Sequence, residues 1–315
     1  MAREILVVRL GAMGDIIHTL PAVSTLHASF PSARITWMIE PRWRPLLEGN
    51  SAIDEIAEFD RAGGLSGMWR SARALRTRAF DLGIDFQGLI KSAGALRVAG
   101  PARRWGRRHP REALARWFYT SSSAVAEAAH IVEQHLELAR AAGAYNRTIA
   151  FPLPPGWPEG VLPAGRFVLA SPWAGWVSKQ WPLENYSALA RRLGDELGLP
   201  LVMNVPPEPA EAIENLPGVL MHRSGLAGLI DATRRAAAVV GVDSGPLHLA
   251  AALGKPGVAI FGPTDPARNG PYGGSLAVLR QAGAETSYRR EAGHAASMRA
   301  ITPGEVFERL RGCLE

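Results

Sequence analysis

Short apolar, β-branched runs alternate with longer amphipathic stretches along the whole chain. This alternation is typical of βαβ units around a parallel sheet. In the first half it predicts strands at residues 4–10, 33–40, 55–59 and 82–86, and helices at 16–29, 66–79, 111–120 and 130–142. Pro21 lies inside the first helix and is expected to break or restart it, because proline lacks the N–H that a helix interior needs.

The alternation starts again after residue 165. It predicts strands at 166–171, 199–204, 218–222, 238–243, 257–262 and 276–280, and helices at 184–197, 208–215, 226–237, 245–253 and 303–313. Between the two series, residues 151–165 hold five Pro and three Gly, which is the composition of a linker. We therefore expect an α/β protein of two Rossmann-like doubly wound domains, residues 1–155 and 156–315, facing a cleft, with the terminal helix a candidate for packing back on the first domain.

Composition narrows the class of protein. The chain has 315 residues, 47% hydrophobic and 20% charged, which is ordinary for a globular protein with a core. No apolar stretch approaches the ~20 residues of a membrane span, and the opening MAREILVVRLGAMGD is typical of a strand and turn rather than a signal peptide. The single Cys313 excludes internal disulfides and thiolate zinc sites. A cytoplasmic protein is expected.

Positive charge is concentrated in the first half. Residues 1–150 carry 20 Lys and Arg against 14 Asp and Glu, whereas residues 151–315 carry 15 of each. Between residues 86 and 111 there is no acid but there are seven basic residues: Lys91, Arg97, Arg103, Arg104, Arg107, Arg108 and Arg111. Such a block attracts nucleic acid, anionic lipid or a phosphorylated substrate. The alternative is a solvated Arg-rich surface, since only three of the 35 basic residues are Lys (Lys91, Lys179 and Lys255).

The first motif is LGAMGDIIHTLPA (10–22), directly after the first predicted strand. Gly11 and Gly14 permit a tight turn with close backbone approach, and Asp15 follows where the helix begins. The spacing matches neither a dinucleotide fingerprint nor a P-loop. Asp15 is either a functional carboxylate or a helix N-cap. His18 is more typical of a packed or capping histidine than of a catalyst.

The second motif is VVGVDSGPLHLAAALGKPGVAIFGPTDP (239–266). A strand ends at Asp243, Ser244 and Gly245 form a turn, and Pro246 suits the first turn of a helix whose free N–H groups attract an anion. Asp243 would repel a phosphate, so it either binds hydroxyls of the adjoining group or caps the helix. The loop FGPTDP after the next strand lies on the same edge, so the two loops should converge.

The third motif is SPWAGWVSKQWPLENY (171–186). Lys179 lies between polar Ser178 and Gln180 and is flanked by Trp176 and Trp181. A lysine on this loop could balance the charge of a diphosphate leaving group. The alternative is an ordinary surface lysine.

Five segments together carry a family resemblance: GAMGDIIHTLPA (11–22), DFQGLIKSA (85–93), KQWP (179–182), VDSGPLHLAAAL (242–253) and FGPTDP (261–266). In this order they resemble the family 9 glycosyltransferases, the ADP-heptose:lipopolysaccharide heptosyltransferases of Gram-negative bacteria, and among these the type I enzymes. All three lysines fall in or beside matched segments.

The resemblance implies a GT-B fold and inverting transfer of heptose from ADP-heptose to the Kdo sugar of a Kdo-lipid A acceptor, with no metal or other cofactor. It implies that Asp15 is the general base, that Lys179 contacts the donor phosphates and that Asp243 holds the heptose hydroxyls. Further donor-side residues would be Met13, Gly14, Ser244, Gly245 and His248, with Glu208 or Glu211 at the adenosine ribose. Acceptor-side residues would be Lys91, Arg111, His18 and Gln87.

Alternatives remain at this level. The donor motifs do not separate type I from type II or III enzymes, or from a relative that transfers another sugar. A hinged pair of αβ domains is also compatible with a sugar-binding protein without catalysis, although a carboxylate such as Asp15 is superfluous for binding alone. The expected partners are ADP-heptose, the acceptor and the anionic inner-membrane surface, contacted peripherally by a monomer, with no nucleic acid.

Overall fold

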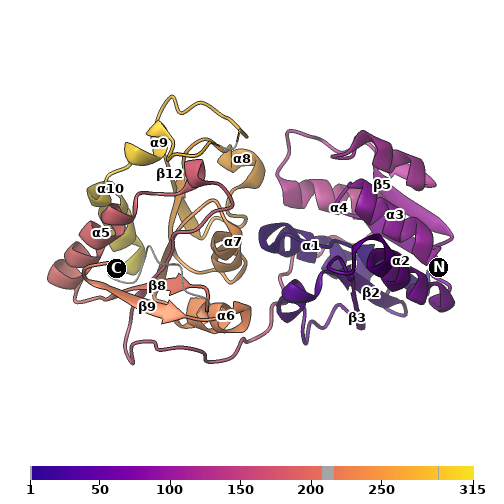
Figure 1. The fold of residues 1–315 in the computed structure, drawn as a ribbon, viewed down its shortest axis with the longest axis horizontal. Coiled ribbons are helices and arrows are strands. Elements are labelled where there is room, and N and C mark those ends of the chain that lie inside the picture. Colours follow the sequence, from indigo (N-terminus) through magenta and orange to yellow (C-terminus); the bar gives the residue numbers. More distant parts are fainter. Residues whose placement is uncertain (1, 208–215, 290) are drawn as a thin grey trace. The chain divides into compact units, whose positions relative to one another are not determined.

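The computed structural model describes residues 2–207, 216–289 and 291–315. The chain divides between Pro154 and Pro155 into two compact units, one residue from the boundary that the sequence predicts. Each unit holds one six-stranded parallel sheet with helices packed against it (Figure 1). The predicted helix 208–215, with Glu208 and Glu211, lies outside the described residues. No helix among the described residues is long and apolar enough to cross a membrane.

The N-terminal unit has the strand order β3-β2-β1-β4-β5-β6, with every pair parallel. Helices α1 and α4 pack together, and α2 packs against α3 on the opposite face, as right-handed crossovers require. The strands are β1 Glu4–Val8, β2 Arg34–Ile39, β3 Glu55–Glu58, β4 Leu82–Asp85, β5 Arg103–Arg107 and β6 Ser121–Ser123. The helices are α1 Met13–Ser29, α2 Gly64–Ala74, α3 Ile90–Ala99 and α4 Ile131–Ala141, with 3-10 turns η1 Pro41–Leu46, η2 Leu75–Arg78 and η3 Ala113–Phe118.

Two predictions for this unit are wrong. Helix α1 runs through Pro21 without a break, because most of the helix is buried and packs on α4, and this packing outweighs one missing hydrogen bond. The helix predicted at 111–120 is the short 3-10 turn η3, and β6 follows it. Helix α3 and strands β5 and β6 are not among the elements that the sequence predicts. The segments RRWGR and SSS lack the apolar alternation of strands, and their pairing in the sheet makes them strands.

The C-terminal unit has the strand order β12-β11-β10-β7-β8-β9, again all parallel. All six strands that the sequence predicts here are present. They are β7 Val168–Ser171, β8 Leu201–Val205, β9 Val219–Arg223, β10 Ala238–Val242, β11 Gly257–Phe261 and β12 Leu276–Arg280. The helices are α5 Leu183–Leu197, α6 Leu226–Arg235, α7 Gly245–Ala252, α8 Pro266–Asn269, α9 Ala296–Arg299 and α10 Pro303–Leu314, with the 3-10 turn η4 Val177–Lys179.

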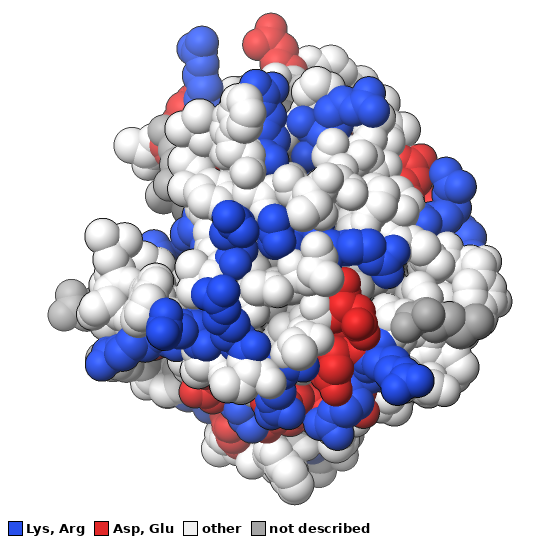
Figure 2. All heavy atoms as spheres, turned by 90° about the vertical axis from the view of Figure 1, so that its right-hand side faces the viewer, with Lys and Arg blue, Asp and Glu red and all other residues white. Residues whose placement is uncertain are grey.

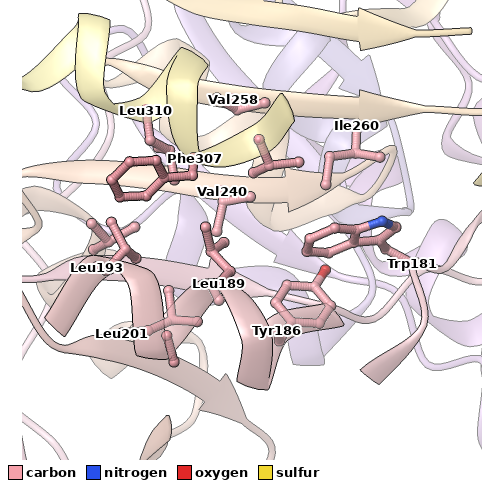
Figure 3. Packing of buried hydrophobic residues seen from close by; sticks show 14 of the residues in the cluster. Trp181, Tyr186, Leu189, Leu193, Leu201, Val240, Val258, Ile260, Phe307 and Leu310 are labelled. Carbon is pink, nitrogen blue, oxygen red and sulfur yellow. The ribbon is translucent and has the colours of Figure 1, made fainter. Parts of the chain in front are cut away.

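The core of this unit lies where α5 and α10 cover one face of the sheet (Figure 3). Trp181 is fully buried there, meets the ring of Tyr186 edge-on at 4.9 Å, and donates its indole N–H to the Ile301 carbonyl at 2.9 Å. Trp181 therefore anchors the end of the loop that carries Lys179.

The proline-rich segment at the boundary is not a free linker. The backbone N–H of Trp157 donates to Ala227 O at 3.2 Å, and the Glu159 carboxylate accepts from the N–H of Gly225 at 2.6 Å. The residues after Pro155 are therefore fastened to the C-terminal unit, ahead of its first strand.

Both sheets reverse their strand order at one point. In the N-terminal unit β1 lies beside β4, and in the C-terminal unit β7 lies beside β10. In open parallel sheets, ligands bind outside the carboxyl ends of the two strands at such a switch point. The loops after these four strands hold four of the five matched motifs. Topology alone therefore directs attention to them.

Candidate active site

Asp15 lies at the switch point of the N-terminal unit. Ala12 is the N-cap of α1, so Asp15 is the third helical residue and its alternative role as an N-cap is wrong. Its Oδ2 lies 2.5 Å from Nη2 of Arg9. The Arg9 side chain is only 7% exposed and also donates from Nη1 to the Phe86 carbonyl at 2.7 Å, whereas that of Asp15 is 39% exposed. A buried guanidinium thus fixes an accessible carboxylate.

Gly11, in the turn before Asp15, occupies a position where a larger residue would not fit. A Cβ on Gly11 would meet the Trp43 indole nitrogen at 2.7 Å, which is closer than packed atoms approach. This confirms the close approach expected at Gly11. Met13 is buried and Gly14 half-buried in the first turn of α1. Their donor contacts stay predictions.

Asp85 organises the loop after β4. Its buried carboxylate accepts hydrogen bonds from the Tyr119 hydroxyl at 2.7 Å, the Ser92 hydroxyl at 2.9 Å and the backbone N–H of Gln87 at 2.8 Å. Burial raises the pKa of Asp85, against the effect of these donors. The Gln87 side chain in turn accepts the N–H of Leu10 at 2.9 Å, so the loops after β1 and β4 are tied together.

Lys91 belongs to a cluster of cations around one carboxylate. Glu40 follows β2, and its side chain is 8% exposed. Its oxygens lie 3.1 Å from Arg42, 3.5 Å from Arg61 and 3.3 Å from Lys91. Three cations on one carboxylate leave an excess of positive charge at the carboxyl edge of the sheet.

The two remaining acceptor candidates differ in accessibility. Arg111 is exposed, and its backbone N lies close to Gly88 in the same loop as Gln87. His18 is buried on α1, where its ring meets that of His130 edge-on, with the ring centres 5.4 Å apart. The His18 backbone carbonyl oxygen lies within hydrogen-bond distance of Nδ1 of His135, at 3.1 Å. This placement supports packing as the role of His18, and its contact with an acceptor stays a prediction.

Lys179 and Asp243 meet at the switch point of the C-terminal unit. The Lys179 ammonium lies 2.7 Å from Asp243 Oδ2 and 5.0 Å from the centre of the Trp176 ring. The Thr264 hydroxyl donates to the same oxygen at 2.8 Å, and His248 Nε2 lies 3.6 Å from Oδ1. The loops after β7, β10 and β11 therefore converge as expected. With its side chain 15% exposed, Lys179 is not an ordinary surface lysine.

The charge of Asp243 is stabilised despite its burial. Burial alone would raise the pKa of Asp243, but the hydrogen bond to His248 and the charge of Lys179 outweigh it and hold this pKa well below its ordinary value. Asp243 is therefore a carboxylate at neutral pH.

The start of α7 lies directly beside this pair. Ser244 is the N-cap, so the alternative role of Asp243 as the cap is wrong. The Ser244 hydroxyl is buried and has no hydrogen-bond partner among the described residues. Gly245 and Pro246 form the first turn, as predicted, and His248 follows one turn later. The N–H groups of this turn point out of the helix end, where an anion is stabilised.

Sequence reasoning missed three residues that hold these groups in place, namely Arg9, Glu40 and Thr264. Each was visible as a polar residue just after a buried strand: Arg9 after β1, Glu40 after β2 and Thr264 after β11. Among the described residues, no group of three or more His, Cys, Asp or Glu side chains is arranged to hold a metal ion.

The two Rossmann-type units, each with polar loops at its switch point, match solved heptosyltransferase structures, which confirms the predicted GT-B fold. The model of glycosyltransferase family 9 (heptosyltransferase) matches residues 68–296, well over half of the chain, and the chain belongs to this family. Membership favours the enzyme prediction over the sugar-binding alternative.

Individual relatives agree with this assignment. The chain is 31% identical over 299 residues to lipopolysaccharide heptosyltransferase 1 of Pseudomonas aeruginosa. The aligned region covers 86% of this chain and 82% of that protein. The solved structure of E. coli heptosyltransferase WaaC with ADP is 25% identical, with a TM-score of 0.78 over 97% of this chain and 98% of that one. The structure of E. coli ADP-heptose lipopolysaccharide heptosyltransferase II is also 25% identical, with a TM-score of 0.81 over 99% and 98%.

Proposed function

We propose that this glycosyltransferase moves heptose from ADP-heptose to a Kdo sugar of the lipopolysaccharide inner core, with inversion at the anomeric carbon and without a metal. Relatives that carry the name lipopolysaccharide heptosyltransferase, and the ADP complex of WaaC, support the donor and the sugar. The observation that carries the proposal is topological. The motif of Asp15 lies at one switch point, and those of Lys179 and Asp243 lie at the other.

Asp15 is placed to act as the general base. Arg9 holds its Oδ2, while the side chain as a whole is 39% exposed and open to solvent. Oδ1 takes the proton of the acceptor hydroxyl as that oxygen attacks the anomeric carbon. The new bond forms opposite the bond to the diphosphate oxygen, which breaks and leaves ADP with the electron pair.

Lys179 and the first turn of α7 meet the charge that develops on ADP. The ammonium has three donors, so it can contact a diphosphate oxygen while it stays on Asp243. Asp243, charged and fixed by Thr264, accepts hydroxyls of the heptose. Two cationic features thus take the place of a metal ion.

The acceptor is expected at the cation cluster of the N-terminal unit. Arg42, Arg61 and Lys91 surround Glu40 and leave excess positive charge, with exposed Arg111 on the loop beside Lys91. A Kdo-lipid A head group carries carboxylates and phosphates, so it complements this charge. The enzyme then works as a monomer in the cytoplasm, in peripheral contact with the anionic inner membrane.

Release of ADP tests the proposal. The purified enzyme, ADP-heptose and Kdo-lipid A should give ADP and a heptosylated product in the presence of EDTA, and Asp15→Asn should remove most of this activity. A second candidate is the type II reaction, favoured by the TM-score of 0.81 to heptosyltransferase II. An acceptor that already carries one heptose separates the two. Turnover only on that acceptor would replace the type I assignment, and an absolute requirement for a metal would contradict the mechanism.

A further inference from the structure

A second basic region of the N-terminal unit lies away from the candidate active site. The ends of α2 and α3 and the start of β5 line an open pocket of about 390 Å³. It is at the amino edge of the sheet, whereas Asp15 and the Glu40 cluster are at the carboxyl edge. The cavity, which we term the arginine pocket, is lined by Trp69, Arg73, Arg76, Arg97, Val98, Gly100 and Arg104.

The arginine pocket carries four positive charges and no negative one. None of its arginines takes part in an ion pair among the described residues. Elsewhere in the unit, Arg44, Arg78 and Arg147 are paired with carboxylates. Figure 2 shows the side of this unit that bears α2 and α3, with Lys and Arg side chains spread across its middle. Four guanidinium groups without counter-charges repel one another, and a bound anion would relieve that repulsion.

Two of the arginines, Arg73 and Arg104, are held in place by contacts that consume no charge. Arg73 stacks on the Trp69 indole, 4.8 Å from the ring centre. Arg104 donates from Nε to the Phe118 carbonyl and from Nη1 to the Pro101 carbonyl, each at 2.9 Å. Burial, and after it the charge of Arg97, lowers the pKa of the Arg104 guanidinium, which records the positive field of the pocket.

Arg76 lies against the end of α3. Its side chain passes over Gly100, which has a positive φ of 81° and no Cβ to fill the space beneath Arg76. The guanidinium groups of Arg73 and Arg104 therefore have restricted positions before any ligand arrives, which lowers the entropy lost on binding.

We propose that the arginine pocket binds phosphate groups, as a second anion site distinct from the active site. Planar guanidinium groups match phosphate oxygens with paired hydrogen bonds, which ammonium groups do not. Leu65 and Trp69, one turn apart on α2, are 82% and 50% exposed beside the pocket. An exposed leucine and indole next to unpaired arginines suit the boundary of a lipid bilayer, so the source that these contacts favour is a phospholipid head group.

The experiment compares two double variants of the full chain with the same loss of charge. The double substitution Arg76→Gln and Arg97→Gln removes two exposed positive charges from the arginine pocket. Arg140→Gln with Arg191→Gln removes two exposed arginines elsewhere and is the matched control. Each protein is sedimented with vesicles of phosphatidylcholine, with or without phosphatidylglycerol. Each is also titrated calorimetrically with inorganic pyrophosphate in saturating ADP, so that the diphosphate site proposed at Lys179 and α7 is already occupied. Circular dichroism and the melting temperature check the fold, and Arg97→Gln alone serves if the pair destabilises it.

Wild type and control should bind with the same affinity. The affinity of the pocket variant should be lower by roughly tenfold or more. A loss on phosphatidylglycerol vesicles assigns the pocket to lipid head groups. A loss for pyrophosphate without any vesicle binding assigns it to a soluble diphosphate. Absence of binding by the wild type to both probes, or equal losses in pocket variant and control, would overturn the proposal.

Discussion

The two units place an aspartate at the same point of the same topology, with opposite electrostatic results. Asp85 is the last residue of β4, and Asp243 directly follows β10, its counterpart in the second sheet. Both side chains are buried. Neutral donors surround Asp85, and burial raises its pKa. A lysine and a histidine adjoin Asp243, and they lower its pKa in spite of burial.

This difference separates a structural carboxylate from one suited to substrate. Asp85 uses its hydrogen bonds to shape the loop that carries Gln87 and Lys91. Asp243 holds the ammonium of Lys179 in a shielded position, where electrostatic effects are stronger than in water. The N-terminal unit places its own ion pair one loop away, between Arg9 and Asp15, with the carboxylate exposed. Under the proposed function, each unit thus contributes one group to the chemistry, Asp15 as the base in the first and Lys179 as the cation in the second.

The largest effect is expected for Asp15→Asn. The amide cannot take a proton, so kcat should fall by ~10²–10⁴ while the fold is kept. ADP release under saturating substrates measures this. Near-wild-type turnover would remove Asp15 from the mechanism and leave the first switch point without a base.

Next in size is Lys179→Ala. Loss of the ammonium should cost about 2–4 kcal/mol of transition-state stabilisation, seen as a lower kcat/KM for the donor that added Mg²⁺ does not restore. Lys255→Ala is the matched control in the same unit, because the Lys255 ammonium donates to the Arg234 carbonyl at 2.8 Å and lies outside the candidate active site. Similar losses in both variants would show that the effect is not specific to the site.

A smaller effect is expected at the acceptor. Neutralising Lys91 and Arg111 together should raise the acceptor KM by roughly tenfold and leave the donor KM unchanged, because the groups proposed to bind the donor diphosphate and sugar, Lys179, Asp243 and the first turn of α7, lie in the other unit. The acceptor effect should shrink at ~0.5 M salt if these charges steer the acceptor, since screening shortens their reach. Equal changes in both KM values would refute the assignment of acceptor and donor to different units.

The smallest effect concerns the pH dependence of stability. Because folding lowers the pKa of Asp243 below its ordinary 3.8, its contribution is present above about pH 4 and is lost as the pH falls further. Folding raises the pKa of Asp85, so its contribution is present below about pH 4 and is lost as the pH rises. Urea unfolding from pH 3 to 6 should show wild type gaining on Asp243→Asn by about 1 kcal/mol, and losing to Asp85→Asn over the same range. Slopes of the same sign would contradict the comparison.

The sequence predicts the C-terminal unit better than the N-terminal one, for a physical reason. The central C-terminal strands β7, β10 and β11 are apolar runs buried on both faces, which a local pattern reveals. The strands β5 and β6 depend on pairing with neighbours, and the continuity of α1 through Pro21 depends on packing, neither of which is local. For the site, motif order shows that Asp243 and the FGPTDP loop converge. The partners Arg9 and Thr264 come from distant positions, and only the fold brings them to Asp15 and Asp243.

The central claim is that donor binding belongs to the C-terminal unit and proton transfer to the N-terminal one. Calorimetric titration of ADP into wild type, Asp15→Asn and Lys179→Ala tests it most directly. Asp15→Asn should bind ADP with wild-type affinity. The affinity of Lys179→Ala for ADP should be lower by roughly tenfold or more, because a charge-assisted contact to phosphate is lost. Wild-type affinity in Lys179→Ala together with weakened binding in Asp15→Asn would contradict the claim.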